Sequence, residues 1–198
     1  MLVALQEIHL QIRNAIELGD LARSRRLCDA ILSFCPENLE TLLLKAQVDL
    51  EAGAYTDAGR GFERVLAGDP EGYVACAGLA IAEEGMRDPA AALHWHTRAL
   101  DLNPGNSEIR AERDRLFEQA YPGAPLPEGL SEFAAARALV DIGRFAEAIE
   151  GLRSALAQEP GRFEIKVYLA EILWTCGRPR EAHALSEEIL TEDRKSVV

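Results

Sequence analysis

Two histidines, His94 and His96, are the side chains whose types and spacing come nearest to a metal or catalytic site. On a helix, residues i and i+2 point about 200° apart, so the two imidazoles cannot serve one metal ion or one reacting atom. His96 also shares its place in the pattern described below with Cys28 and Phe62. We therefore interpret His96 as a packed core histidine rather than as a ligand.

The cysteines predict neither a zinc site nor a disulfide bond. The four of them are Cys28, Cys35, Cys76 and Cys176, and no CxxC spacing is present. If Cys28 and Cys35 lie on one helix, they are about 10 Å apart, beyond the roughly 7 Å that a disulfide spans. Reduced thiols are usual in the cytosol, so we expect a cytoplasmic protein.

Other short motifs lack the context that their chemistry needs. The segment Gly59-Arg60-Gly61 has no third glycine and follows no strand pattern, so it does not predict a phosphate-binding loop. Adjacent acids such as Glu83 and Glu84 lie in a helical pattern, without the oxygen-rich loop of a calcium site. We expect no catalytic residue, no cofactor and no bound metal, and hence a protein that is not an enzyme.

The composition predicts an all-helical protein with a packed core. Of the 198 residues, 48% are hydrophobic but only 6% are aromatic. The 21 lysines and arginines face 33 aspartates and glutamates, for a net charge of -12, and such a field repels the phosphates of nucleic acid. No uninterrupted apolar run approaches the roughly 20 residues of a spanning helix, so membrane insertion is not expected.

A period of 34 residues organises the chain. Pro36, Pro70 and Pro104 are 34 residues apart, and Pro160 follows after one more period plus an insertion of 22 residues. Counting from these prolines gives five repeats, at residues 5–38, 39–72, 73–106, 129–162 and 163–196. Internal repetition of this length is typical of solenoid proteins.

Three columns of the repeat predict a helical hairpin. Position 15 is glycine in four of the five repeats and predicts the turn that ends a first helix. Position 20 is small and position 28 is leucine, which lets two helices pack closely around an apolar contact. The members are, column by column, Gly19, Gly53, Arg87, Gly143 and Gly177; Ser24, Ala58, Ala92, Ala148 and Ala182; and Leu32, Leu66, Leu100, Leu156 and Leu190.

These columns, with the proline at position 32, resemble the tetratricopeptide repeat, which has the same period. Five repeats of 34 residues cover 170 of the 198 residues. The resemblance implies an all-α, right-handed superhelical solenoid of antiparallel helix pairs. The chain departs from the family at position 4, where a large residue is usual but Glu132 and Lys166 stand in the last two repeats.

The repeats are expected in blocks of three and two. Residues 107–121 have helical character, with Ile109 and Leu116 on one face, and are predicted to cover the third repeat. Residues 122–128 contain three prolines and cannot continue a helix. The expected domains are therefore 1–121 and 129–198. The repeat pattern fades at residues 192–194, which suggests either a piece of a longer protein or a short disordered tail.

The resemblance implies a partner-binding groove lined by the first helix of each repeat, at positions 2, 5, 9, 12 and 13. The candidate binding residues are Leu43, Gln47, Leu50, Ile81, Phe133, Arg137, Val140, Val167, Glu171 and Trp174. We expect Trp174 to be the strongest anchor, because an exposed tryptophan can bury about 200 Å² in a complex. The lysine, asparagine and arginine clamp that some family members use for carboxylate tails is missing.

Acidic neighbours of this groove predict an amphipathic partner with basic residues beside its apolar ones. They are Glu40, Glu51, Glu84, Asp141, Glu164 and Glu171. We therefore expect a non-catalytic protein–protein interaction scaffold that binds a peptide or helical segment. Two alternatives stay open. In the first alternative, the repeats are the targeting or regulatory region of a larger enzyme, such as a glycosyltransferase or sensor kinase. In the second, the chain is a self-assembling structural component of unspecified oligomeric state.

Overall fold

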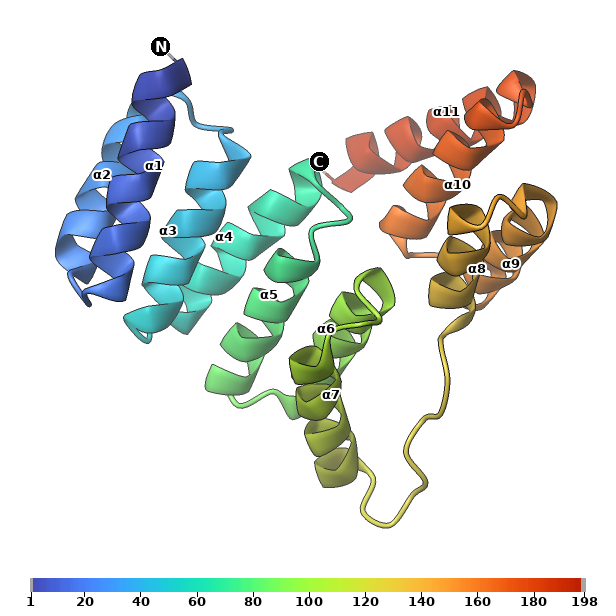
Figure 1. The fold of residues 1–198 in the computed structure, drawn as a ribbon, viewed down its shortest axis with the longest axis horizontal. Helices are drawn as coiled ribbons and strands as arrows, with labels where there is room; N and C mark the ends of the chain where they lie inside the picture. Colours follow the sequence, from blue (N-terminus) through green and yellow to red (C-terminus); the bar gives the residue numbers. More distant parts are fainter. Residues whose placement is uncertain (1, 197–198) are drawn as a thin grey trace. The chain divides into compact units, whose positions relative to one another are not determined.

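A computed structural model describes the backbone of residues 2–196 and the side chains of residues 5–191. These residues contain eleven α-helices and no strand, which confirms the all-α fold (Figure 1). The helices are α1 (Leu2–Glu17), α2 (Leu21–Phe34), α3 (Leu39–Glu51), α4 (Tyr55–Gly68), α5 (Tyr73–Gly85), α6 (Pro89–Leu102), α7 (Ser107–Ala120), α8 (Glu132–Asp141), α9 (Phe145–Gln158), α10 (Phe163–Thr175) and α11 (Pro179–Ser196).

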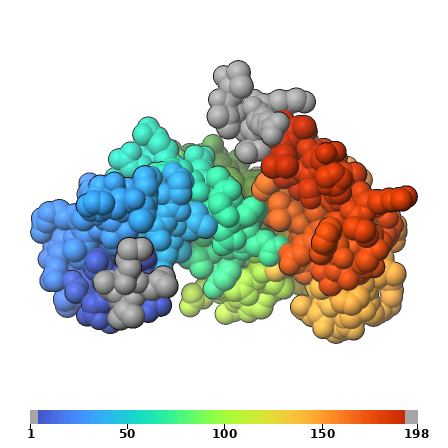
Figure 2. All heavy atoms as spheres, turned by 90° about the horizontal axis from the view of Figure 1, so that it is seen from above, coloured from blue at the N-terminus to red at the C-terminus, as the bar shows by residue number. Residues whose placement is uncertain are grey.

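The helices stack in two compact units, Met1–Leu126 and Pro127–Val198. In the first unit, α1 packs with α2, α3 with α4, and α5 with α6. In the second unit, α8 packs with α9 and α10 with α11. Figure 2 shows the successive repeats of the first unit, coloured from blue to green, packed directly against one another. Each helix pair coincides with one repeat of the sequence.

Position 15 of every repeat adopts the left-handed backbone conformation, as the glycine column predicts. Gly53 has a φ of 71° and Gly177 a φ of 72°, and Arg87 has a φ of 67°. Arg87 is the one residue other than glycine with a positive φ in the described part of the chain. Its N–H still donates to the carbonyl of Glu84 at 2.9 Å. The turn is therefore imposed by the helix pair, even where a side chain makes it costly.

Small residues set the close approach of the paired helices. All five members of position 20 are buried, with exposed fractions of 0–3%. Position 8 contributes Ala46 and Ala80 at 0% and Ala136 at 1%. A Cβ built on Gly61 would lie 2.8 Å from the Cβ of Ala46, so α3 and α4 touch where neither residue has a larger side chain.

The apolar core runs between the helix pairs. In the first unit, Phe62 and Leu79 are 1% exposed and pack in one cluster with Leu42, while Ile12 and Cys28 belong to a second cluster nearer the N-terminus. In the second unit, the largest fully buried side chains are Phe133, Ile149, Leu152 and Ile165. Each cluster draws on adjacent helices, as expected where every repeat contacts only its neighbours.

The α7 helix covers the end of the third repeat. It packs against α6, and Ile109 and Leu116 are buried as predicted. Asn106 caps it by accepting hydrogen bonds from the N–H groups of Glu108 and Ile109, just as Asn38 caps α3. The α7 helix therefore begins like the first helix of another repeat, and residues 121–131 follow without a helix.

The last helix is longer than the repeat pattern suggests. The α11 helix has 18 residues and runs through positions 192–194 to Ser196, whereas α9, the second helix of the preceding repeat, has 14. The expected fading at 192–194 is therefore not a loss of helix. Apolar periodicity alone missed it, because polar residues continue a helix when its start is fixed by packing. Residues 197 and 198 lie outside the described part of the chain.

The left-handed conformation of Arg87 predicts a stabilising substitution. Arg87→Gly should raise the free energy of unfolding of the first unit by about 0.5–1 kcal/mol, because glycine has no Cβ to strain a positive φ. Arg87→Ala is the matched control, since it removes the charge but keeps the Cβ. Urea unfolding followed by circular dichroism measures both. An equal gain in the alanine variant would contradict the explanation.

The two units are expected to unfold in separate transitions, because the joint at residues 122–128 replaces the packing between neighbouring repeats. Leu152→Ala, in the core of the second unit, should cost about 2–5 kcal/mol there. Native-state hydrogen exchange should then lose protection in α8–α11 and keep it in α1–α7. Leu79→Ala should do the reverse. Equal losses in both units from either variant would disprove separate unfolding.

Candidate partner-binding surface

The candidate residues of the first unit lie on α3 and α5. Leu43 and Leu50 are half-buried, because they also pack against the central apolar cluster. Gln47 lies between them in the sequence and is half-buried too. Ile81, on α5, is 47% exposed. This unit thus offers a shallow apolar surface on its first helices, with Ile81 the most accessible of the four side chains.

The candidate residues of the second unit lie on α8 and α10. Arg137 and Val140 on α8 and Val167 on α10 are half-buried, whereas Glu171 is exposed. Trp174, in the last turn of α10, keeps 68% of its surface exposed. Since Val167, Glu171 and Trp174 recur at four- and three-residue spacing, they form one stripe along the helix.

Phe133 differs from the prediction, because its side chain is only 1% exposed. Its ring meets that of Tyr168 edge to face, with centroids 6.1 Å apart. The guanidinium carbon of Arg137 lies 5.6 Å from the Phe133 ring and 4.6 Å from the Tyr168 ring. Phe133 is therefore a core residue that joins α8 to α10, and Arg137 lies over both rings.

A local change of register explains the burial of Phe133. Position 4 holds Leu42 and Cys76 in the second and third repeats, and both are buried. In the fourth repeat, position 4 is Glu132, which is exposed and is the first residue of α8. Phe133, one residue later, fills the core instead. A shift of one residue turns a side chain by about 100° around a helix, so the column alone assigns it to the wrong face.

The acidic surroundings are weaker than the sequence suggests. Glu164 is fully buried and pairs with Arg162 at 2.8 Å, so it offers no charge to a partner. Glu40 pairs with Arg13 at 2.6 Å, and Glu84 with Arg115 at 2.7 Å. The other three predicted acids, Glu51, Asp141 and Glu171, are exposed. The cations that pair with Glu40 and Glu84 lie 27 and 31 residues away in the sequence, whereas Arg162 lies two residues before Glu164. The repeat columns predict none of these pairs.

A hydroxyl, an imidazole and a carboxylate come together between the first two repeats. The Nε2 atom of His9 lies 2.8 Å from the Oγ1 atom of Thr41, and its Nδ1 atom lies 2.9 Å from a carboxylate oxygen of Glu40. Thr41 donates its hydroxyl proton to Asn38 at 2.7 Å, however, and His9 and Thr41 are 1% and 0% exposed. The hydroxyl is neither activated nor accessible, so the group ties α1 to α3.

His96 is buried, as predicted, with 3% of its surface exposed. Neither ring nitrogen has a hydrogen-bond partner in the described part of the protein. Burial lowers the pKa of His96 below its ordinary value of 6.5, while the nearby carboxylates of Glu112 and Glu84 act in the opposite direction and Arg115 lowers it. The imidazole is therefore held in its neutral form.

None of the four cysteines forms a disulfide bond, and the two most buried are Cys28 and Cys76. Burial raises the pKa of Cys28 to about 11, with the carboxylate of Asp29 acting in the same direction. A thiol of this kind is inert as a nucleophile. Among the described residues, no cluster of three or more histidine, cysteine, aspartate or glutamate side chains could hold a metal ion. The same residues include no helix that is long and apolar enough to cross a membrane.

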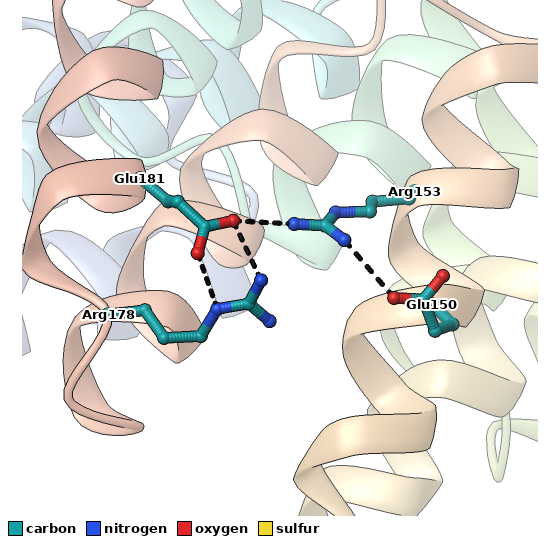
Figure 3. A network of polar contacts seen from close by, with 4 residues as sticks. All are labelled: Glu150, Arg153, Arg178 and Glu181. Atoms are coloured by element: carbon teal, nitrogen blue, oxygen red, sulfur yellow. Dashed lines mark hydrogen bonds and ion pairs between the residues drawn. The ribbon is translucent and has the colours of Figure 1, made fainter.

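An ion-pair network joins the second helices of the last two repeats (Figure 3). Arg153 on α9 lies 3.1 Å from Glu150 and 2.7 Å from Glu181 on α11. Arg178 donates two hydrogen bonds to Glu181, at 2.6 and 2.8 Å, and these hydrogen bonds lower the pKa of Glu181. Three members of the network lie on the second helices α9 and α11, and Arg178 lies in the turn before α11.

The buried histidine predicts a pH dependence. Because the folded protein holds His96 neutral, its contribution to stability is complete above the unfolded pKa near 6.5 and is lost as the pH falls below it. The urea midpoint of the first unit should therefore fall between about pH 7.5 and pH 5.5. His96→Leu should abolish this slope. His183→Gln, at an exposed histidine of the second unit, should leave it unchanged, and a slope that persists in His96→Leu would refute the assignment.

Comparison with known proteins shows what this chain is similar to. Residues 132–197 match the family model described as the tetratricopeptide repeat. The crystal structure of MamA protein has a TM-score of 0.52 at 19% identity, over 96% of this chain and 93% of that one. The tetratricopeptide-repeat domain of OM64 from Arabidopsis has a TM-score of 0.54 at 17% identity, over 57% and 93%.

The corresponding domain of Sgt2 from Aspergillus fumigatus has a TM-score of 0.54 at 18% identity, over 63% of this chain and 87% of that one. No match was found among curated protein sequences. At these identities the solved structures establish the fold alone. The stacked helix pairs and these solved structures give the chain a tetratricopeptide-repeat fold, and the family model matches its second unit.

Proposed function

We propose that the chain is a non-catalytic scaffold that binds an amphipathic helical or extended segment of a protein partner on its first helices. The observation that carries the proposal is the exposure of Trp174, 68% of whose surface is open beside Val167 on α10. Solenoids of helix pairs use extended surfaces of this kind for binding. Tryptophan is also the residue type most often found as an anchor in protein interfaces.

Two adjacent first helices build the proposed surface in the second unit. Phe133 and Tyr168 hold α8 and α10 together through their ring contact, and Arg137 lies against both rings. Val140 and Trp174 stand at position 12 of their repeats and Val167 at position 5. Apolar side chains on two first helices that are joined by this ring contact suit a partner segment that presents one apolar face.

The energetics favour Trp174 as the main anchor. Covering roughly 150 Å² of its ring at about 25 cal/mol per Å² contributes near 4 kcal/mol before ordering costs. Half-buried Val140 and Val167 have less surface left to cover. Truncation of Trp174 should therefore remove about 2 kcal/mol or more of the binding free energy.

Charge adds a preference for basic residues in the partner. Asp141 and Glu171 are exposed beside the apolar stripe of the second unit, and Glu51 is exposed in the first. Since Glu40, Glu84 and Glu164 are paired within the protein, the preference rests on a few carboxylates. Lysine or arginine near the anchor would mainly raise the association rate at low salt.

The test uses a labelled amphipathic peptide with leucines on one face and lysines on the other, and a scrambled peptide of the same composition. Trp174→Ala should weaken binding of the amphipathic peptide about tenfold or more and leave the melting temperature unchanged. In a Trp95→Phe background Trp174 is the sole tryptophan, so its fluorescence should shift to the blue on binding. A large loss of melting temperature with unchanged binding would show that Trp174 is structural instead.

A further inference from the structure

We propose that the first unit carries a second binding site, for an acidic segment of a protein partner, in a pocket between α2, α3 and α4. This basic pocket has a volume of about 450 Å³ and is lined by Arg25, Leu32, Lys45, Arg60, Gly61 and Arg64, among others. Four of the lining side chains are cations from three different helices, and two are acids, Asp49 and Asp57. The site is distinct from the surface assigned above and goes beyond that function.

The hollow has a structural cause. Gly61 of α4 faces Ala46 of α3 so closely that a Cβ on the glycine would lie 2.8 Å from the alanine Cβ. Both residues line the pocket, and neither has a long side chain that could fill it. The longer side chains around them, Leu32 on α2 and Leu42 on α3, supply apolar walls. The lining therefore combines apolar side chains with cations.

Only one of the four cations forms an ion pair with a buried carboxylate. Arg25 bonds to Asp49, whose side chain is 7% exposed. Lys45 pairs with Asp29, which is 52% exposed. Exposed ion pairs contribute only about 0–1 kcal/mol, because water competes for both charges. A ligand carboxylate can replace such partners at little cost.

The two remaining pairs are more open still. Arg60 lies 3.6 Å from Asp57, and both side chains are more than 60% exposed. Arg64 lies 3.0 Å from Glu37, which is 80% exposed, and donates to the carbonyl of Pro36. These arginines are one helical turn apart on α4. Two guanidinium groups on one edge of an apolar hollow form a suitable rim for carboxylates, which arginine binds through paired hydrogen bonds.

The basic pocket and the first-helix surface use different faces of α3. The pocket takes Leu42, Lys45, Ala46 and Asp49 from this helix, while the candidate surface takes Leu43, Gln47 and Leu50. On a helix of 3.6 residues per turn, the centres of these two sets are separated by about 100° or more. One partner can therefore occupy the pocket while another occupies the first helices.

The charge of the whole chain decides in favour of a short acidic peptide over nucleic acid. A net charge of -12 opposes a long polyanion, which would lie partly outside the cationic rim. A short segment senses mainly the charges within the Debye length of about 8 Å at physiological salt. The apolar walls also suit a leucine or similar side chain next to the carboxylates, which a free phosphate does not have.

The experiment measures fluorescence anisotropy of a short labelled peptide in which glutamates alternate with leucines, with inorganic phosphate as a competitor. We expect saturable binding that weakens as salt is added. The double variant Arg60→Glu and Arg64→Glu should weaken binding about tenfold or more, since charge-assisted hydrogen bonds are lost and repulsion is added. Arg60→Glu alone, at a side chain 72% exposed, should give a smaller loss of affinity. Circular dichroism should show the same helix content for this variant as for the unmodified protein.

The matched control is Arg180→Glu, at an exposed arginine on α11, which changes the net charge in the same way as Arg60→Glu far from the pocket in sequence. It should change the affinity less than about twofold. An equal loss of peptide affinity in this control would overturn the proposed site. The proposal would also fail if phosphate bound with the same dependence on Arg60 and Arg64 while the peptide did not bind. Trp174→Ala should leave acidic peptide binding unchanged, so failure of this site and failure of the proposed function are separate results.

Discussion

Close contact between the two helices of each repeat is the constraint on which the rest of this structure depends. Because position 20 is buried and small in all five repeats, the helix backbones approach each other and the turn between them must be tight. The tight turn requires the left-handed conformation at position 15, including at Arg87. With the hairpin fixed in this way, each first helix has one face for its partner helix and another left for solvent or a ligand.

The features that repeat along the chain were those that the sequence could predict. The helix pairs, their turns and the buried alanines follow from contacts within one repeat, so the same local pattern recurs at the same spacing. The α7 helix was also predictable, because its apolar residues Ile109 and Leu116 follow a helical period. Even the exceptional Arg87 adopts the conformation of its column, since geometry rather than residue type decides it.

The features that failed or were missed depend on contacts between repeats. Phe133 was assigned to the surface, but Tyr168, Arg137 and Arg162 pack against its ring. Glu164 was counted as a free acid because nothing in its own repeat position reveals the pairing with Arg162. The basic pocket gave no signal either, since its cations come from three helices and share no column. Of the predicted binding residues, Ile81, Glu171 and Trp174 are the exposed ones.

The repeat positions that pack the two helices together are not the positions that lie on the candidate surface, so the two sets can change independently during evolution. Positions 8 and 20 hold the hairpins together, whereas positions 9 and 12 carry side chains as different as Gln47, Ile81, Glu171 and Trp174. Substitution in the second set leaves the first untouched, so partner choice can drift while the architecture is conserved. Duplicated copies of a gene encoding this fold can thus acquire different ligands through a few changes on one helical stripe, without passing through an unfolded ancestor.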